Sequence, residues 1–229
     1  MSVNVGIDVS KESLDICLLH DQTKSGRKYR QFKNKKGTYS EVSDWLLKVS
    51  NCKPEDVLIT MESTGVYHES IALHLYTAGF LIFISNPGKA SKFSQSIGLI
   101  HKTDKSDSYM LALYGDAQGN RAQKWVPDSL NARNVKSLSR RLSALEKDRL
   151  RESNRLEASE ISDANDRVKI SIVRVIEVIN EEISSIEQEI ELIISADSDM
   201  NKNHKLLQSI VGIGKVMSRE LVSLIPACT

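Results

Sequence analysis

The first 125 residues place their hydrophobic side chains in short runs separated by polar turns. Some runs alternate with polar residues, which is typical of strands with one exposed face, and others are continuously apolar, which is typical of buried strands. This pattern predicts strands at 3–9, 14–19, 28–33, 57–61 and 80–85. The first three follow one another closely and are therefore expected to form a meander.

Between these strands the apolar spacing becomes helical. The apolar residues of 37–49 fall on one helix face, and helices are also expected at 68–79 and from Asp104 onward. Three strands in meander order followed by alternating helices and strands predict an α/β fold with a mixed sheet. The strand order is that of a ribonuclease-H-like domain, expected over residues 1–126.

Beyond Pro127 the apolar residues follow a heptad pattern. The isoleucines from Ile172 to Ile193 are spaced alternately four and three residues apart, and a similar seam runs from Val135 to Leu145. The polar segment 162–166 predicts a break between two helices. Residues 127–200 are therefore expected to form a helical hairpin or a two-helix coiled coil that self-associates. One long helix packed on the first domain is the alternative.

The composition adds limits to this picture. Of 229 residues, 40% are hydrophobic and 27% charged, which is typical of a globular protein. No apolar run approaches the roughly 20 residues that span a bilayer, so no membrane partner is expected. Cys17, Cys52 and Cys228 have no paired or metal-like spacing and predict free thiols in a reducing compartment. A cytoplasmic location of the bacterial type is expected.

The net charge of only +1 conceals local concentrations of charge. Residues 24–36 contain seven Lys or Arg and no acid, with Tyr29 and Phe32 between them. Such a segment can bind phosphates and stack on bases. The candidate nucleic-acid contacts here are Lys28, Arg30, Lys33 and Lys35. A solvated edge strand that uses lysines against aggregation is the alternative.

Two further basic segments are candidate contacts. One surrounds the start of the helix at Asp104 and consists of Lys89, Lys92, His101, Lys102 and Lys105. The other is 133–155, which includes Arg140 and Arg141 and has eight Lys or Arg against three acids, whereas 177–199 has eight acids and no base. The basic half can pair with the acidic half or lie along phosphates, and the sequence leaves both open.

Four acids are candidate metal ligands. Asp8 interrupts an apolar strand, where a carboxylate is costly unless it is paired or binds a cation. Glu62 directly follows a buried strand, and Asp104 and Asp107 are three residues apart on one face of a helix start. Oxygen ligands alone suit Mg²⁺ or Mn²⁺, and two such ions can support phosphodiester displacement. The alternative for Asp104 and Asp107 is an ordinary preference for a helix N-terminus. Asp15, Asp116 and Glu69 are interpreted as surface acids.

Three motifs in order carry a family resemblance: GIDVSK at 6–11, MESTGVY at 61–67 and KTDKSD at 102–107. The chain thereby resembles the DEDD-type insertion-sequence transposases, a family that includes pilin-gene inverting and bridge-RNA-guided recombinases. NRL at 154–156 and IVGIGKVMSREL at 210–221 also match. The resemblance implies a RuvC-like domain with Asp8, Glu62, Asp104 and Asp107 as the metal-binding tetrad. It implies DNA transposition and recombination, and it leaves a guide RNA open as a second partner.

Residues near the tetrad have expected supporting roles. Lys11 and Lys102 are candidates to neutralise phosphate, and Thr64, Gly65 and Tyr67 are candidates to approach the nucleic acid; a turn-forming role is the alternative for Gly65. Residues 201–229 are expected to begin a C-terminal domain with a partial helix-hairpin-helix. In that motif Gly212, Gly214 and Lys215 would contact a phosphate.

The family continues into a region with a serine nucleophile that has no match here. We therefore expect this chain to be truncated or a fragment and strand exchange by it alone to be incomplete. Two other readings follow. One is a nucleic-acid-binding, dimerising module without chemistry. The other is a sugar-kinase or actin-like ATPase, because those proteins also begin with a Gly-Ile-Asp-Val-Ser strand, but the sequence lacks their Gly-rich phosphate loops.

Overall fold

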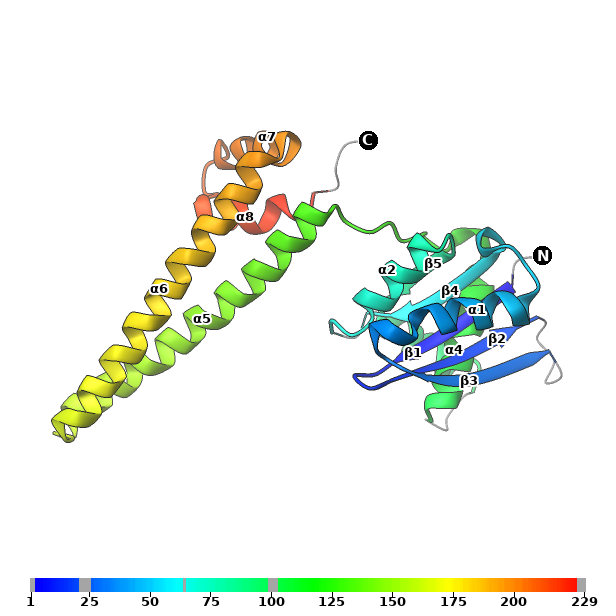
Figure 1. Cartoon of the computed structure of the whole chain (residues 1–229), viewed down its shortest axis with the longest axis horizontal. Coiled ribbons are helices and arrows are strands. Elements are labelled where there is room, and N and C mark those ends of the chain that lie inside the picture. Colours follow the sequence, from blue (N-terminus) through cyan, green and yellow to red (C-terminus); the bar gives the residue numbers. More distant parts are fainter. Residues whose placement is uncertain (1–2, 21–25, 64, 99–102, 226–229) are drawn as a thin grey trace. The chain divides into compact units, whose positions relative to one another are not determined.

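Five strands in the first part of the chain form one mixed sheet (Figure 1). The computed structural model describes residues 3–20, 26–63, 65–98 and 103–225, except for the side chain of Asp104. The strands are β1 (Val3–Val9), β2 (Ser13–Leu19), β3 (Arg27–Lys33), β4 (Val57–Glu62) and β5 (Leu81–Ser85). Their order is β3-β2-β1-β4-β5, with β2 antiparallel to β1 and β3, and β4 parallel to β1 and β5. This order makes the domain ribonuclease-H-like, as the sequence predicts.

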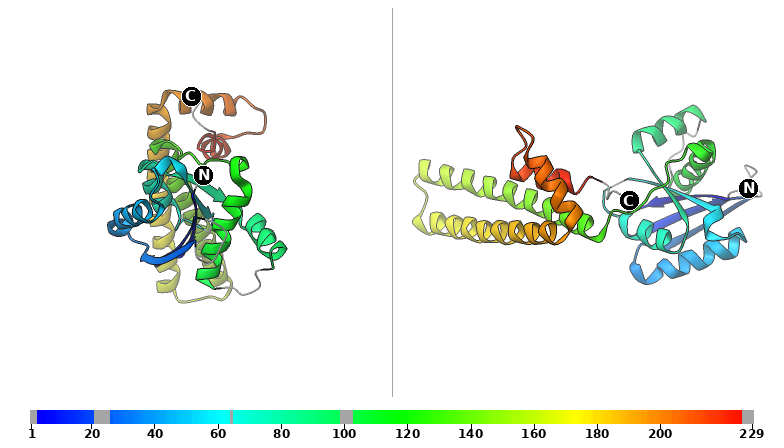
Figure 2. Two further views of the ribbon diagram at one scale, coloured as in Figure 1. Left: turned by 90° about the vertical axis from the view of Figure 1, so that its right-hand side faces the viewer. Right: turned by 90° about the horizontal axis from the view of Figure 1, so that it is seen from above.

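Helices cover both faces of the sheet, because side chains alternate between the faces along each strand. Val5, Ile7 and Ile59 point to one face, where they form the main core with α1 (Tyr39–Ser50) and α2 (Glu69–Thr77). The opposite face carries α4 (Asp104–Gln118), beside which α3 (Pro87–Ser96) packs. The view from above in Figure 2 separates the two helical layers, with α1 on one side of the strands and α4 on the other.

Close contact between α4 and the sheet depends on Gly6. A Cβ atom at Gly6 would lie 1.9 Å from the carbonyl oxygen of Ser108 and 2.4 Å from the amide nitrogen of Ala112. The helix backbone therefore rests directly on β1. At Gly115 a Cβ would lie 2.2 Å from Oγ1 of Thr60 on β4. Two glycines thus allow α4 to approach the two central strands.

The predicted elements of this unit are confirmed within one or two residues, including β1 at 3–9 and the start of α4 at Asp104. Helix α3 was not predicted. Its sequence, PGKASKFSQS, is polar and only Ala90 is buried, so it lacks an apolar face of normal width. The short 3₁₀ turns Lys36–Thr38, Pro54–Asp56 and Gly119–Arg121 complete the unit.

The contacts divide the chain into two compact units, Met1–Pro127 and Asp128–Thr229. The second unit is helical and consists of α5 (Leu130–Ile161), α6 (Asp166–Ala196), α7 (Ser198–Gln208) and α8 (Lys215–Val222). Helices α5 and α6 form an antiparallel hairpin (Figure 1). The alternative of one long helix is therefore wrong. A separate C-terminal domain from residue 201 remains a prediction.

The predicted apolar seam packs α5 against α6 at the end of the hairpin away from the turn between the two helices. Val135, Leu142 and Leu145 of α5 pack with Ile186 and Ile190 of α6 in one core. Met200 of α7 and Val222 of α8 join the same core. The break falls where the sequence predicts it, and Asn165 caps α6 by accepting a hydrogen bond from the amide of Arg167. Over the described residues, no helix has both the length and the apolar character needed to cross a bilayer.

Candidate metal-binding active site and nucleic-acid surface

Polar side chains form a row across the sheet on the face covered by α4. Asp8 of β1 is paired with Asp15 of β2, and Asp15 is paired with Gln31 of β3. The parallel register of β1 and β4 continues from the pair Ile7–Met61, so the next position sets Asp8 beside Glu62. Paired residues of adjacent strands point to the same face. Three carboxylates, those of Asp15, Asp8 and Glu62, therefore follow one another on neighbouring strands.

The first turn of α4 lies level with this row. Helix α4 runs antiparallel to β1, because Asn4 donates a hydrogen bond to Asp116 while Gly6 lies against Ser108 and Ala112. Two residues along β1 cover about 6.6 Å, which corresponds to four or five residues of helix. Moving along β1 from Gly6 to Asp8 therefore corresponds to moving along α4 from the region of Ser108 and Ala112 toward its N-terminus. This brings Asp8 level with the first turn of α4, which contains Asp104 and Asp107.

A capping box fixes where α4 begins. Thr103 accepts a hydrogen bond at its hydroxyl from the amide of Ser106, and the Ser106 hydroxyl accepts one from the amide of Thr103 at 2.8 Å. This arrangement satisfies helix N–H groups that would otherwise lack partners. The local sequence TDKS therefore starts the helix at Asp104, so both acids belong to its first turn.

The donor set suits a hard divalent cation, because carboxylate oxygens are the ligands that Mg²⁺ and Mn²⁺ prefer. At the β5 end of the row, Ser85 is paired with Glu62, and its buried hydroxyl has no hydrogen-bond partner among the described residues. A polar atom is thus available beside Glu62 for water or ligand. The described side chains do not include three or more Asp, Glu, His or Cys groups arranged to hold a metal ion. Asp104 lies outside that description, and the tetrad stays a prediction.

Asp15 is buried, so its interpretation as a surface acid was wrong. Only 2% of its surface is exposed. Both faces of β2 are covered, one by the main core and the other by α4, against which Cys17 and Leu19 pack. Asp116 is likewise half-buried and accepts the hydrogen bond from Asn4, whereas Glu69 is exposed as predicted.

One asparagine connects the loops that follow Asp8 and Glu62. The amide of Asn34 donates to the carbonyl oxygens of Ser10, at 2.8 Å, and Tyr67, at 3.2 Å. Its oxygen accepts a hydrogen bond from the hydroxyl of Tyr39 at 2.7 Å. Sequence reasoning missed Asn34, although a polar residue directly after a basic strand was a signal. The candidate contacts in these loops, Lys11, Gly65 and Tyr67, are exposed. Thr64 lies outside the described residues.

The candidate contacts of β3 are divided between the two faces of the sheet. Lys33 is paired with Ser13 and shares the face of Asp15 and α4, whereas Lys28 and Arg30 share the opposite face with Phe32. The guanidinium of Arg30 stacks on the Phe32 ring at 4.6 Å. Alternation along the strand therefore separates these candidate contacts, which stay a prediction, between two faces.

Two pairs of a cation and an aromatic ring lie on the α4 face of β3. The sequence pointed to Lys105 and Tyr29 separately but not to their contact. The ammonium of Lys105 lies 5.0 Å from the centre of the Tyr29 ring, and the guanidinium of Arg27 lies 3.6 Å from that of Tyr109. Burial raises the pKa of the nearby Cys17 thiol to about 11, although the charges of Arg27 and Lys105 oppose this shift. Cys17 is therefore a protonated core residue at neutral pH.

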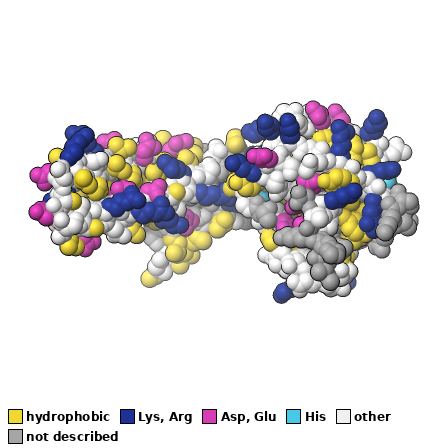
Figure 3. Space-filling model, turned by 90° about the horizontal axis from the view of Figure 1, so that it is seen from below, with side chains coloured by type: hydrophobic (Ala, Val, Ile, Leu, Met, Phe, Trp, Pro, Cys, Tyr) yellow, Lys and Arg dark blue, Asp and Glu magenta, His cyan; other side chains and the backbone are white. Residues whose placement is uncertain are grey.

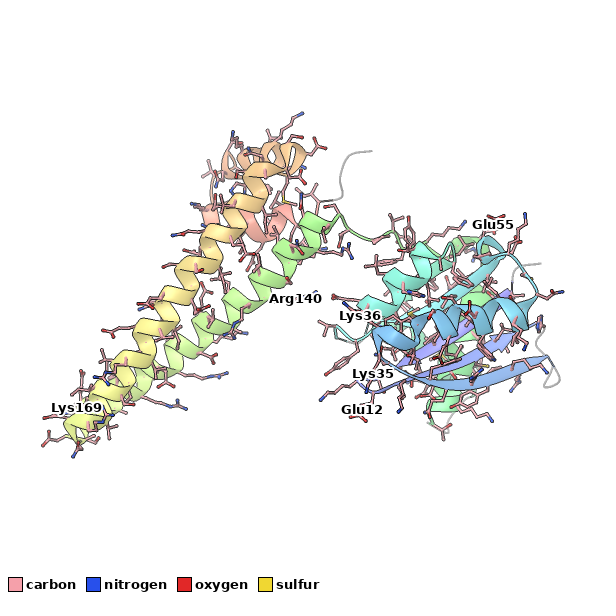
Figure 4. All side chains as sticks on the ribbon, viewed as in Figure 1. Glu12, Lys35, Lys36, Glu55, Arg140 and Lys169 are labelled. Atoms are coloured by element: carbon pink, nitrogen blue, oxygen red, sulfur yellow. The ribbon has the colours of Figure 1, made fainter. Side chains whose placement is uncertain are left out.

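The other basic candidates of the first unit lie in several places. Figure 4 labels Lys35 close to Glu12 at the end of the unit where β1 turns into β2, opposite the end labelled by Glu55. Lys89 and Lys92 are exposed on α3. His101 and Lys102 lie outside the described residues.

In the second unit the basic candidates are exposed but not isolated from acids. Arg140 extends from α5 away from α6 (Figure 4), and Arg141 is also exposed. Figure 3 shows Lys and Arg side chains interspersed with Asp and Glu over the hairpin. Lys215, proposed from sequence to reach a phosphate, lies 3.5 Å from Glu191, so an acid of its own unit already faces it. Gly212 and Gly214 are exposed in the turn before α8, and Gly212 has a positive φ of 93°.

Comparison with known proteins bears on the first unit in particular. The family model of the IS110-type DEDD transposases matches residues 5–159, which include all four candidate acids. The chain belongs to this transposase family. Two relatives are pilin gene-inverting proteins, from Moraxella bovis and Moraxella lacunata, each 26% identical over 214 residues. The match covers 92% of the chain but 62% of each relative, so the chain spans less than two thirds of their length.

Two solved structures of RuvC from Thermus thermophilus are also similar to this transposase-family chain. One has a TM-score of 0.39 and covers 53% of the chain; the other, a complex with a Holliday junction substrate, has a TM-score of 0.38 and covers 54%. Both are 12% identical and are covered over 98% of their length. The ribonuclease-H-like assignment follows from the strand order described above.

Proposed function

We propose that the first unit contains the active site of a metal-dependent DNA transposase or site-specific recombinase. Asp8, Glu62, Asp104 and Asp107 are its ligands of Mg²⁺ or Mn²⁺. The observation that carries the proposal is the position of these acids. Two lie at neighbouring points of β1 and β4, and two lie in the helix turn level with them. Carboxylates that meet at one point repel one another unless a cation lies between them.

The bound cation would stabilise negative charge on the phosphodiester and favour an oxygen nucleophile. The residues of this chain have separate tasks. The four carboxylates would hold the cation. Lys33 and Lys105, exposed on that face or at its helix, bind the phosphates of the strand. Tyr67, exposed in the loop after Glu62, can stack on a base.

Family membership supports DNA recombination as the activity of the complete protein. The pilin gene-inverting relatives are named for inversion of a DNA segment, and their similarity extends over most of this chain. The second candidate function is a nucleic-acid-binding module without chemistry. The exposed cations of β3 and α5 favour it, since they act independently of the four acids. Mn²⁺ binding distinguishes the two, because only the active-site function requires it.

Calorimetric titration of the chain with Mn²⁺ tests the active site. Asp8→Asn and Glu62→Gln should each weaken binding at least about tenfold, because each removes a charged ligand. Asp56→Asn is the matched control, since Asp56 is exposed and precedes β4 at the other end of the strand. Equal Mn²⁺ affinity in all four proteins would refute the site.

The division of β3 between two faces allows a sharp test of DNA binding. Lys33→Glu combined with Lys105→Glu should weaken duplex binding and reduce the slope of log affinity against log salt by about one per lost phosphate contact. Lys28→Glu combined with Arg30→Glu makes the same charge change on the opposite face and should have a smaller effect. If the second pair has the larger effect, the phosphate surface is on the α1 side. Repeating the titration with single-stranded RNA tests whether a guide RNA binds the same surface.

We also propose that the chain self-associates through the hairpin. Beyond the seam that packs α5 on α6, α6 exposes Val168, Val175 and Val178, spaced seven and three residues apart on one face. Val175 and Val178 line a groove of about 320 Å³ together with Arg167 and Arg174. Exposed β-branched residues in register favour a second copy as the partner.

Sedimentation equilibrium tests self-association directly. Val175→Glu with Val178→Glu should shift the chain toward monomer, because each change introduces a charge into an apolar contact. Val173→Glu is the control, since Val173 is also exposed on α6 but lies about 200° around the helix from Val175. A monomeric unaltered chain at high concentration would exclude this contact.

A further inference from the structure

Asp15 is a buried carboxylate whose charge has no ionic partner among the described residues. Its hydrogen-bond partners are the neutral side chains of Tyr29, Gln31 and Ser13. Burying a carboxylate without a cation is unfavourable, and neutral hydrogen bonds offset only part of that cost. The fold therefore holds this carboxyl group on the α4 face by hydrogen bonds rather than by a counter-charge.

The same hydrogen bonds fix the orientation of the Asp15 carboxylate. The amide nitrogen of Gln31 lies 3.1 Å from one carboxylate oxygen and 3.2 Å from the other. The hydroxyl of Tyr29 donates to the first oxygen, and that of Ser13 donates to the second at 3.2 Å. These contacts occupy most of the positions at which a carboxylate can accept hydrogen bonds. Asp15 cannot rotate without losing several of them.

Asp8 is the neighbour that experiences this fixed charge. Asp8 and Asp15 are paired across β1 and β2, and directly opposed like charges on one sheet face repel. Since Asp15 is held, the repulsion acts on the side chain of Asp8 and favours positions away from β2. The strand on its other side is β4, where Glu62 lies at the next position of the register.

We propose that Asp15 is a positioning residue that directs Asp8 toward Glu62 and increases the attraction of the carboxylate row for a divalent cation. Asp15 itself does not coordinate the metal, because its oxygens are already taken up by Tyr29, Gln31 and Ser13. Groups beside metal ligands commonly change metal affinity by about tenfold or more. This role rests on the proposed cation site of Asp8 and Glu62.

The chain provides a matched control in Asp116. It is also an acid on the α4 face, and its carboxylate accepts a 2.8 Å hydrogen bond from Asn4, which is four residues before Asp8 on β1. Asp116→Asn removes the same charge at the far end of the strand. The comparison of Asp15 with Asp116 therefore separates a local effect on Asp8 from a general loss of negative charge.

The test is calorimetric titration with Mn²⁺ of the full chain and its variants. Asp15→Asn should weaken Mn²⁺ binding about tenfold, whereas Asp116→Asn should change it less than about twofold. Asparagine has the shape of aspartate, and its oxygen can still accept from Tyr29. Circular dichroism during heating identifies any variant that fails to fold.

A second variant keeps the test decisive if Asp15→Asn does not fold. Tyr29→Phe keeps the charge of Asp15 but removes one hydrogen bond that holds it, so Mn²⁺ binding should weaken about two- to threefold. Unchanged Mn²⁺ affinity in every folded Asp15 and Tyr29 variant, with Asp8→Asn still impaired, would overturn the role of Asp15 alone. If neither the unaltered chain nor Asp8→Asn binds Mn²⁺, the proposed cation site itself fails.

Discussion

Buried charged side chains have opposite surroundings in the two units. In the second unit, Arg219 is 5% exposed and donates hydrogen bonds to Glu187 and Glu191, each at 2.8 Å. In the first unit, the buried carboxylate of Asp15 is surrounded by neutral donors and lies beside a further acid, Asp8, on the next strand. The first arrangement cancels its charges and ties α8 to α6. The second leaves negative charge concentrated at one place, which is what a cation-binding site requires and a structural contact does not.

The largest expected effect concerns the contact between α4 and β1 at Gly6. Gly6→Ala should lower the free energy of unfolding by about 3 kcal/mol or more, because the added Cβ meets helix backbone that cannot move aside. Gly37→Ala adds the same atom where nothing lies within 4 Å and should change stability by less than about 0.5 kcal/mol. Urea denaturation monitored by circular dichroism measures both. Equal stabilities would mean that α4 does not rest on β1.

Removing the buried positive charge of Arg219 from the second unit should have the next largest effect on stability. Arg219→Met leaves Glu187 without its partner and Glu191 with only Lys215, and should cost roughly 2–3 kcal/mol, at or just below the lower limit for buried pairs because both acids are partly exposed. Arg155→Met removes an exposed arginine that pairs with Glu152 one helix turn away, and should cost less than about 0.5 kcal/mol. Thermal unfolding gives both values, and a neutral Arg219→Met would show that charge matching does not hold α8.

A smaller effect is expected at the start of α4. Thr103→Ala removes the hydroxyl that accepts from Ser106 and should lower stability by about 1 kcal/mol. Thr77→Ala removes a hydroxyl that donates only to Leu73 within α2 and is the control. Denaturant titration of the two variants side by side measures the difference. A loss at Thr77 as large as that at Thr103 would argue against a specific capping effect.

The smallest effect is a pH dependence in the second unit. Burial opposes ionisation of Glu191, but the hydrogen bond and charge of Arg219, with Lys215, hold the pKa of Glu191 below its ordinary 4.5. The unfolded chain therefore binds this proton more readily. The stabilisation is complete above about pH 4.5 and is lost as the pH falls through the lower pKa of the folded state.

Melting temperatures between pH 6 and pH 3 measure this dependence. Glu191→Gln should remove part of the slope and leave the part due to Asp197. The pKa of Asp197 is also lowered, through hydrogen bonds from Asn131 and the amide of Met200. A slope unchanged in Glu191→Gln would contradict the assignment.

Much of this architecture could be predicted from sequence, because its signals are local. Strand β1 places an apolar residue at every second position, β4 is a nearly continuous apolar run, and the pair Thr103–Ser106 marks the start of α4. The two helices of the hairpin are visible in their heptads. The family motifs supply the four acids as candidates.

The burial of Asp15 could not be predicted from the local pattern. In SLDICLL its position between Leu14 and Ile16 is typical of the exposed face of a strand. That face is covered by α4, a helix far along the chain, and its pairing with Asp8 depends on the length of the turn at 10–12. By contrast, the separation of Lys28 and Arg30 from Lys33 follows from simple alternation and was available from the sequence.

The hydrogen bonds of Asn34 also have a consequence for motion. The loop after β1 and the loop after β4 are anchored by the two hydrogens of one amide group, and Tyr39 prevents that amide from turning over. Local opening at this edge of the sheet therefore involves both loops in one event. Asn34, the residue that follows the basic strand β3, therefore couples the backbones of two loops that belong to different strands.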